Sequence, residues 1–233
     1  MPQRVLVGTS GYNYPEWRGT FYPEKFSTTR MLPFYAERFP TVEINYTFYR
    51  LPDEKLLAGW SAQTPDHFCF TLKAPRRITH DAKLQRCEDL VSTFCRVAGT
   101  LGPKLGVLLF QLPPSFRKDL PVFEQFLDAL PPGTRAAFEF RHPSWHEAEV
   151  FEALRSRNLA LCIADSEKMS TPVEVTATYA YFRLRDEGYG QADIARWAQT
   201  ISGLAGTDDV FVYFKHEEQG LGPDFAQRLM AQL

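Results

Sequence analysis

Short apolar runs alternate with segments of helical periodicity along almost the whole chain, and this alternation restricts the fold more than any other feature. Each run is four to seven residues long, the usual length of a buried strand. Two successive strands that are joined by a helix lie parallel in one sheet. The runs predicted to form strands are residues 5–8, 42–46, 68–73, 106–111, 135–141, 159–164, 179–185 and 210–214.

The segments between these runs carry helical signals. Asp53 and Asp119 stand where helix caps are expected, each just before an amphipathic segment. Only residues 166–178 show poor periodicity, so we expect one reduced helix there, after the sixth strand. The clearest helix ends at a Gly-Pro pair, residues 102–103, and repeats apolar residues every three or four positions: Leu90, Phe94, Val97 and Leu101.

Eight strand–helix units in 233 residues predict an α/β protein with a single TIM-like (β/α)8 barrel domain over residues 1–233. The alternative is a doubly wound open sheet, which usually has a glycine-rich turn that leads from an early strand into a helix. Residues 8–12, Gly-Thr-Ser-Gly-Tyr, lack the third glycine of that turn and do not lead directly into a helix. The barrel is therefore the favoured fold.

Composition bears on where the chain works and what it binds. Lys and Arg total 26 against 28 Asp and Glu, so a net charge of −2 gives no overall attraction to nucleic acid. No apolar run reaches the roughly 18 residues that span a bilayer, and the N-terminal run is too short for a secretion signal. The four cysteines show no CxxC spacing and are predicted to be free thiols. We therefore expect a cytoplasmic protein with no membrane partner.

Polar side chains gather at the C-terminal ends of seven of the eight predicted strands. In a (β/α)8 barrel these ends meet at one mouth, where ligands bind. Buried charges are costly unless they are paired, so such a group is not expected by accident. Two interpretations remain open: a ligand site, which is favoured, or an ion network that satisfies itself, for example Glu139 with Arg183.

We predict that this site combines acidic and basic groups. Lys73, Arg141 and Arg183 are suited to clamp an anion, because guanidinium forks match phosphate and carboxylate geometry. The candidates for acid–base catalysis are the carboxylates at strand ends: Glu43, Glu139 and Asp165. Further ligand-binding candidates lie beside them or in neighbouring loops: Tyr12, Asn45, Gln111, His142, Trp145 and Lys215.

Metal and cofactor motifs are weak. The five histidines form neither HxH nor HExxH, and the chain has no GxSxG elbow and no Walker loop. We therefore expect no cofactor. A divalent metal is the alternative, and it would need four side chains that are distant in the sequence to converge on folding: Glu139, His142, Asp165 and His216.

Several motifs, in their order along the chain, resemble those of one known family. They are residues 8–12, Trp17, and residues 21–23, 42–50, 111–116, 139–145 and 181–183. These motifs run nearly end to end, and the chain is similar to the YecE-like proteins, the domain of unknown function 72. The resemblance implies a TIM barrel and no established activity. Two positions depart from the family: Arg-Asp at 185–186, where it often has His-Gly, and Lys-His at 215–216, where it often has paired Asn.

Three functions compete. The favoured one is an enzyme that acts on a small anionic polar ligand, phosphorylated or sugar-like, through acid–base chemistry of the carboxylates. The second is nucleic-acid binding or repair, based on Arg76, Arg77 and the loop aromatics, and on the distant likeness to endonuclease IV-type and sugar-isomerase barrels that the resemblance implies. Nucleic acid is not the favoured partner because the net charge is negative. The third is a non-catalytic ligand sensor that uses the same mouth.

Overall fold

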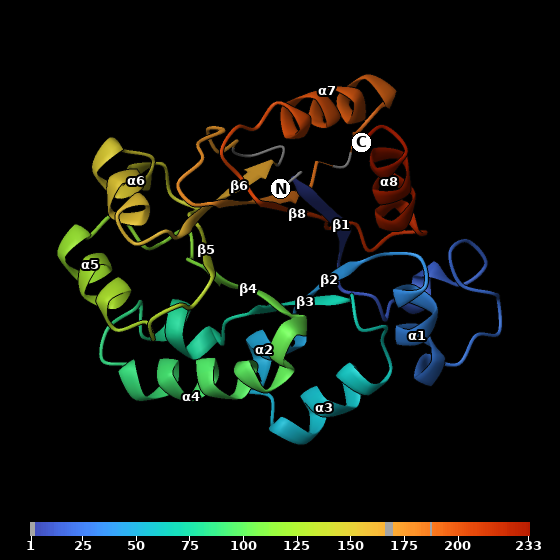
Figure 1. Cartoon of the computed structure of the whole chain (residues 1–233), viewed down its shortest axis with the longest axis horizontal. Coiled ribbons are helices and arrows are strands. Elements are labelled where there is room, and N and C mark those ends of the chain that lie inside the picture. Colours follow the sequence, from blue (N-terminus) through green and yellow to red (C-terminus); the bar gives the residue numbers. More distant parts are fainter. Residues whose placement is uncertain (1–2, 166–169, 187) are drawn as a thin grey trace.

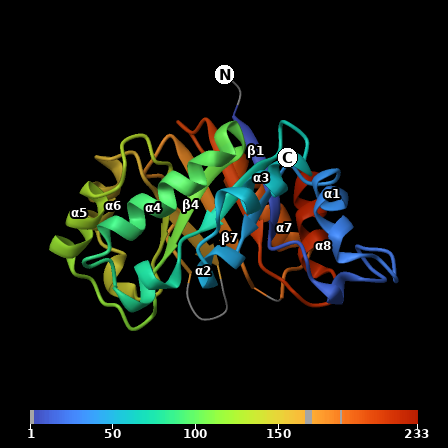
Figure 2. The ribbon, with the colours of Figure 1, turned by 90° about the horizontal axis from the view of Figure 1, so that it is seen from below.

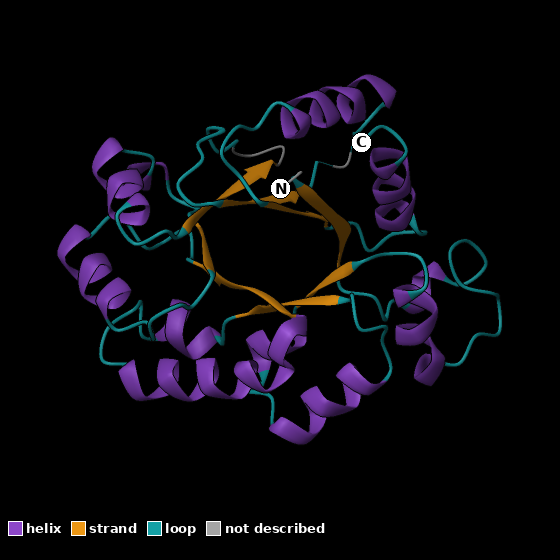
Figure 3. Cartoon of the chain, viewed as in Figure 1, coloured by secondary structure: helices purple, strands orange, loops and turns teal. Residues whose placement is uncertain are grey.

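The computed structural model describes residues 3–165, 170–186 and 188–233. Its eight strands are parallel, and each pairs with its neighbours in chain order to close a barrel (Figures 1 and 3). The predicted (β/α)8 TIM-like barrel is therefore confirmed. The strands are β1 (Arg4–Ser10), β2 (Thr41–Ile44), β3 (Cys69–Lys73), β4 (Leu105–Gln111), β5 (Ala136–Glu139), β6 (Ala160–Asp165), β7 (Tyr179–Leu184) and β8 (Asp209–Phe214).

Helices form a ring around the strands (Figure 1): α1 (Met31–Ala36), α3 (Glu54–Ala62), α4 (Glu88–Ala98), α5 (Leu120–Asp128), α6 (Ala148–Arg155), α7 (Gln191–Ser202) and α8 (Leu221–Met230). The short helix α2 (Tyr46–Tyr49) lies instead at the end of the barrel opposite the start of β1 (Figure 2). Shorter helical turns are η1 (Pro15–Trp17), η2 (Thr28–Arg30), η3 (Arg77–Asp81), η4 (Gly99–Lys104) and η5 (Pro143–Trp145). Among the described residues, no helix has the length and apolar character needed to cross a membrane.

The predicted capping residues begin their helices. Asp53 Oδ1 accepts a hydrogen bond from the backbone N–H of Leu56 at 2.8 Å, and Asp119 Oδ1 accepts one from Val122 at 3.2 Å. The described residues between β6 and β7, 170–178, form no helix, in agreement with the reduced helix expected there. Residues 166–169, the rest of that predicted segment, lie outside the described residues.

The second strand is shorter than predicted, because it ends at Ile44 and not at Tyr46. Asn45 already has helical backbone angles, φ −89° and ψ −18°, and α2 follows it directly. Aromatic residues such as those of α2 favour strands in general, so composition alone was misleading here. The helical turn allows the Thr47 hydroxyl to donate to the backbone oxygen of Lys73 at 2.6 Å. This turn places Asn45 at the rim of the barrel.

Side chains on the strands alternate between two cores. The outward side chains pack under the helices. Inside the barrel, the Tyr213 hydroxyl lies 2.7 Å from the Thr41 hydroxyl and 2.8 Å from the Thr71 hydroxyl. The inward apolar side chains include Leu6, Cys69, Val107, Leu109, Ala137, Cys162, Ala164, Tyr181, Phe211 and Tyr213. The interior is therefore a packed core, and it forms the floor beneath the C-terminal mouth.

Gly8 marks a very close approach of β1 to β2. A Cβ atom at this position would lie 2.1 Å from the Thr41 backbone oxygen. We expect Gly8→Ala to lower the free energy of unfolding by about 2 kcal/mol, because the backbone of β2 would have to move. Urea unfolding measures this loss.

Gly59 in α3 is the matched control, since a Cβ there would meet nothing within 4 Å. Gly59→Ala is expected to raise the free energy of unfolding by about 1 kcal/mol, because alanine is the better helix former. Equal effects of the two substitutions would contradict the close approach at Gly8.

Candidate functional site

The inward side chains at the C-terminal strand ends form one polar layer above the apolar floor. Each has the same parity as the inward side chains below it on its own strand, so strand alternation carries it into the barrel. The layer therefore lies at the end of the barrel where α2 is seen in Figure 2. Its buried members are Ser10, Glu43, Lys73, Gln111, Glu139 and Arg183.

Arg183 is at the centre of this layer and is fully buried, with 0% exposure. Its Nε lies 3.0 Å and 2.9 Å from the two carboxylate oxygens of Glu43, and its Nη2 donates to Glu43 Oε1 at 2.7 Å. Glu43 also accepts hydrogen bonds from the Tyr181 hydroxyl, at 2.5 Å, and from the Ser10 hydroxyl. Both oxygens of Glu43 are therefore engaged.

Glu139 occupies the other side of Arg183 and is also 0% exposed. Arg183 Nη1 donates to Glu139 Oε2 at 2.9 Å, and Gln111 Nε2 donates to the same oxygen at 2.7 Å. The other oxygen of Glu139 accepts from Arg141 Nε at 2.9 Å. We call this set of Ser10, Glu43, Gln111, Glu139, Arg141, Tyr181 and Arg183 the Arg183 network.

Both carboxyl groups of the Arg183 network are ionised. Burial is the largest single effect and by itself would raise their pKa values, but the charge of Arg183 and the other charges and hydrogen bonds around each carboxylate together outweigh it, so the pKa values of Glu43 and Glu139 are both lowered. A carboxylate with a lowered pKa that accepts several hydrogen bonds is a weak base and no proton donor. The geometry therefore favours a role for Glu43 and Glu139 in positioning the arginines over the predicted acid–base role.

Lys73 lies in the same layer without comparable partners. It is 8% exposed, and its Nζ is 4.1 Å from the centroid of the Phe48 ring. Within the described residues, Nζ has no hydrogen bond and no ion pair. Burial lowers the pKa of Lys73 to about 7, and the positive charges of Arg183 and Arg141 act in the same direction. Lys73 is therefore an amine that is substantially uncharged at neutral pH.

Arg185 follows β7 with the same parity as Arg183. Its Nε is buried and lacks a hydrogen-bond partner, and no ion pair in the described part of the chain involves its guanidinium. Burial lowers the pKa of Arg185, but a guanidinium keeps its charge at neutral pH. Three arginines therefore accompany two carboxylates at the mouth, so the positive charge exceeds the negative charge.

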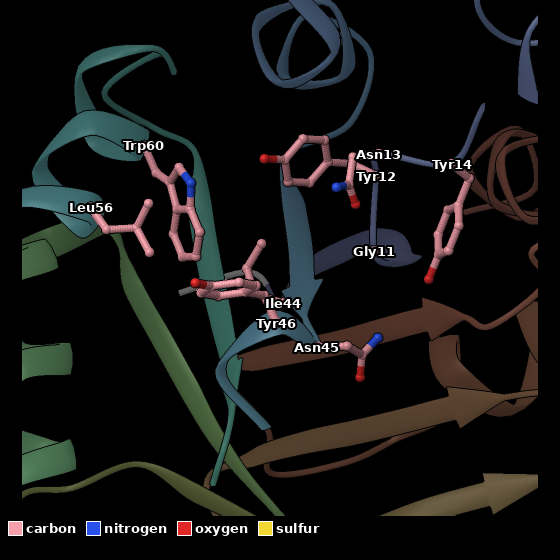
Figure 4. Close-up of a pocket in the computed structure, with 9 residues that line it drawn as sticks. All are labelled: Gly11, Tyr12, Asn13, Tyr14, Ile44, Asn45, Tyr46, Leu56 and Trp60. Atoms are coloured by element: carbon pink, nitrogen blue, oxygen red, sulfur yellow. The ribbon is translucent and has the colours of Figure 1, made fainter. Parts of the chain in front are cut away.

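A cavity of about 280 Å³ opens beside the polar layer (Figure 4). Figure 4 shows Tyr12, Tyr46 and Trp60 around one space, between the loop after β1, α2 and α3. Asn45 belongs to both regions, because it lines the cavity and its Nδ2 donates to Ser10 Oγ at 2.7 Å. The lining residues are Gly11, Tyr12, Asn13, Tyr14, Ile44, Asn45, Tyr46, Leu56 and Trp60. A ligand in this cavity would thus touch the polar layer at Asn45.

Two predicted residues at strand ends do not join the Arg183 network. Asp165 has the opposite parity to Ala164, which points into the barrel, and it accepts a hydrogen bond from the Tyr189 hydroxyl at 2.9 Å. Lys215 Nζ lies 3.6 Å from a carboxylate oxygen of Glu217, and its side chain is half-buried. In the described residues, neither group is hydrogen-bonded or ion-paired to Glu43 or Glu139.

The two predicted residues after β5 serve the local structure. His142 Nδ1 accepts from the backbone N–H of Ser144 at 3.2 Å and so caps η5. Trp145 is 0% exposed, its Nε1 donates to the Phe116 backbone oxygen at 2.7 Å, and its ring stacks on Phe140 at 4.9 Å between centroids. The predicted ligand contact of Trp145 is incompatible with this burial, since apolar packing covers the indole.

A metal site is not formed by the residues that the structure describes. They contain no group of three or more His, Cys, Asp or Glu side chains arranged to hold an ion. His142 is held by Ser144, and His216 Nε2 lies 2.7 Å from the Asp186 backbone oxygen. The convergence of Glu139, His142, Asp165 and His216 that a metal would need is therefore absent from the described residues.

Ser10 and Tyr181 were missing from the predicted site, and Arg185, which the sequence places at the mouth, was not among its assigned ligand-binding residues. A signal for them existed, because each has the inward parity of its predicted strand. Ser10 lay just beyond the predicted first strand, residues 5–8, whereas β1 extends to Ser10. Tyr181 was missed because it stands in the middle of an apolar run.

Comparison with known proteins gives consistent matches. A sequence model for the family described as "Protein of unknown function DUF72" matches residues 6–233. The UPF0759 protein YecE of Escherichia coli (strain K12) is 33% identical over 168 residues, which are 70% of this chain. The match covers 59% of the YecE sequence.

Solved structures show the same fold. A DUF72 family protein from Thermotoga maritima MSB8 superposes with a TM-score of 0.85 at 26% identity, and the match covers 98% of each chain. A DUF72 family protein from Enterococcus faecalis V583 has a TM-score of 0.83 at 18% identity, over 98% of this chain and 95% of that one. The second likeness concerns the fold alone.

Proposed function

The chain belongs to the DUF72 family of proteins of unknown function, and we propose that it binds a small anionic polar ligand at the C-terminal mouth of its barrel and acts on it there. The observation that carries this proposal is the pair Arg185 and Lys73, which lie in the mouth with no side-chain hydrogen bond and no ion pair in the described residues. The carboxylates next to them are already saturated by the Arg183 network. An anionic ligand would supply the missing negative charge.

The charges at the mouth favour this kind of ligand over a cation. Glu43 and Glu139 each accept hydrogen bonds on both oxygens, so neither presents a free oxygen to a cation. Arg185 offers a guanidinium fork, which matches phosphate or carboxylate oxygens. Its Nε is buried, and an anion that pairs with it would relieve an unsatisfied donor.

The neighbouring cavity suits the uncharged part of such a ligand. Its volume of about 280 Å³ and its aromatic walls fit a small ring, such as a sugar or a planar heterocycle. Asn45 at its edge offers an amide for a ligand hydroxyl or carbonyl. A phosphorylated or sugar-like ligand therefore remains the favoured class.

We expect inorganic phosphate, and more strongly glucose 6-phosphate, to raise the melting temperature of the protein at constant ionic strength. Arg185→Gln should weaken binding at least ~10-fold, because a buried charge-assisted contact is lost. Isothermal titration calorimetry measures the change in Kd.

The matched control is Arg196→Gln, on the exposed face of α7, where Arg196 pairs with Asp193. It should leave binding unchanged. The proposal fails if no anion stabilises the protein, or if Arg185→Gln binds phosphate as tightly as the native chain.

Further measurements distinguish the two other candidate functions. Binding of single-stranded DNA or RNA that weakens steeply with salt would favour the nucleic-acid function. One part of its basis is reduced by the structure, since Arg76 pairs with Asp81 at 3.2 Å beside the exposed Arg77. Ligand binding without any turnover would favour a sensor.

A further inference from the structure

We propose that Lys73 is a nucleophilic amine that forms an imine with an aldehyde or ketone carrying a phosphate or carboxylate group. This inference rests on the proposed function, because it takes the same anionic ligand at the same positively charged mouth. It goes further by naming the reacting atom of the protein, Lys73 Nζ, and the reacting group of the ligand, a carbonyl carbon.

The first support is the position of Lys73. It ends β3 with the inward parity of Cys69 and Thr71, so its side chain enters the polar layer at the mouth. Its Nζ lies over the face of Phe48 at 4.1 Å from the ring centroid. Solvent reaches this nitrogen, since in the described residues it is not among the buried polar atoms without a partner.

The second support is the contrast with another buried lysine. Lys104 is 7% exposed, close to the 8% of Lys73. Its Nζ donates to the backbone oxygens of Ser61 and Thr64, both at 2.8 Å. Those bonds hold the side chain of Lys104 in place, whereas Nζ of Lys73 has no hydrogen bond within the described residues. The two side chains are buried to the same extent but differ in the freedom of the amine to react.

The third support is the charge around Lys73. Arg183 on β7 and Arg141 after β5 disfavour the ammonium form, while Glu139 and Glu43 favour it. His80 in η3 packs edge-on against Phe48, with ring centroids 5.0 Å apart. The pKa of His80 is lowered by burial and by the charge of Lys73. With burial, the sum lowers the pKa of Lys73 to about 7, which leaves a large neutral fraction at physiological pH.

The chemistry balances without an oxidant or reductant. The lone pair of the neutral Lys73 amine forms a bond to the carbonyl carbon as the C=O π bond breaks, and a proton passes from the nitrogen to the oxygen to give the hydroxyl of a carbinolamine. Loss of that hydroxyl with a proton releases one water molecule and leaves the C=N bond of the imine. The protonated imine then withdraws electrons from the neighbouring carbon. The excess of positive charge at the mouth orients the anionic group of the ligand beside this carbon.

Glyoxylate, a small anionic aldehyde, is the probe for this step. The protein is incubated with glyoxylate and sodium cyanoborohydride at pH 7, and the reduced adducts are located by peptide mass spectrometry. We expect Lys73 to be labelled at least ~10-fold faster than Lys104 and the exposed lysines. Acetaldehyde, which lacks the anionic group, should show a much smaller preference for Lys73. Even labelling of all accessible lysines by glyoxylate would overturn the inference.

Two variants complete the test. Lys73→Arg keeps the positive charge and should abolish the fast adduct, and circular dichroism checks that it is folded. Arg185→Gln should slow labelling of Lys73 by glyoxylate but not by acetaldehyde. If phosphate binds and Lys73 is not labelled, the imine is wrong and the proposed function stands. If Lys73 is labelled equally fast by both aldehydes and phosphate does not bind, the anion site is wrong.

Discussion

Replacement of Arg183 by methionine is expected to lower the free energy of unfolding at pH 7 by about 3–5 kcal/mol. Arg183 is fully buried and bonded to Glu43 and Glu139, both also fully buried. Without the guanidinium, two carboxylates would face each other in the barrel interior with no positive charge between them. Urea unfolding at pH 7 measures the loss.

The control is Arg228→Met on α8, where the exposed Arg228 pairs with Asp224 four residues earlier. A surface pair of this kind contributes less than about 1 kcal/mol. The triple variant Glu43→Gln, Glu139→Gln, Arg183→Met removes the buried charges together and should recover a large part of the loss. If Arg183→Met were as mild as Arg228→Met, the Arg183 network would not hold the barrel together as described.

The second large effect that we expect is a steep fall in the free energy of unfolding in acid. The pKa values of Glu43 and Glu139 are lowered in the folded state, so between pH 5 and pH 3 the unfolded chain binds more protons than the folded one. The stabilisation by these groups is complete above their unfolded pKa, near 4.5, and is lost as the pH falls towards their folded pKa. Together they contribute a slope of up to about 2.7 kcal/mol per pH unit.

Unfolding free energies measured from pH 6 to pH 3 provide this slope. The triple variant lacks both carboxylates and should show a clearly shallower dependence on pH. The exposed acidic residues are common to both proteins, so the difference between the two curves isolates Glu43 and Glu139. Parallel curves would show that these two groups titrate alike in the folded and unfolded chains.

Much of the fold follows from patterns that are local in the sequence. Apolar runs, the caps Asp53 and Asp119, and the poor periodicity after the sixth strand all have a short-range physical cause, and the structure confirms them. The ends of some strands were exceptions, among them the end of β2. There the bond from Thr47 to the backbone of Lys73 supports a helical turn, and no local propensity reveals that partner.

The alternating direction of side chains along each strand was enough to predict which residues of the candidate site meet inside the barrel. Glu43, Glu139 and Arg183 stand at inward positions and meet, whereas Asp165 follows β6 at an outward position and pairs with Tyr189. A polar residue at a strand end therefore joins the site only if its side chain also points into the barrel. Trp145 was misplaced for a related reason, because an aromatic residue in a loop can turn back into the core.

The choice between a self-paired network and a ligand site could not be made from residue types. The structure shows the pairing of Glu139 with Arg183, while Lys73 and Arg185 have no ion pair in the described residues, and the ligand site stays a proposal. Which charged side chains remain without an ion pair depends on the hydrogen-bond geometry between residues of five strands. That geometry exists only once the barrel has closed.

Asn45 borders both the cavity and the polar layer at the mouth. Its Nδ2 is committed to Ser10, and its Oδ1 lies 3.5 Å from Nη2 of Arg183, while its outer side faces the aromatic hollow. A ligand that contacts this amide would therefore also affect the Ser10 hydroxyl and the Arg183 guanidinium next to it. The cavity and the polar layer therefore meet at Asn45, and a ligand that occupies only one of them forgoes the contacts that the other offers.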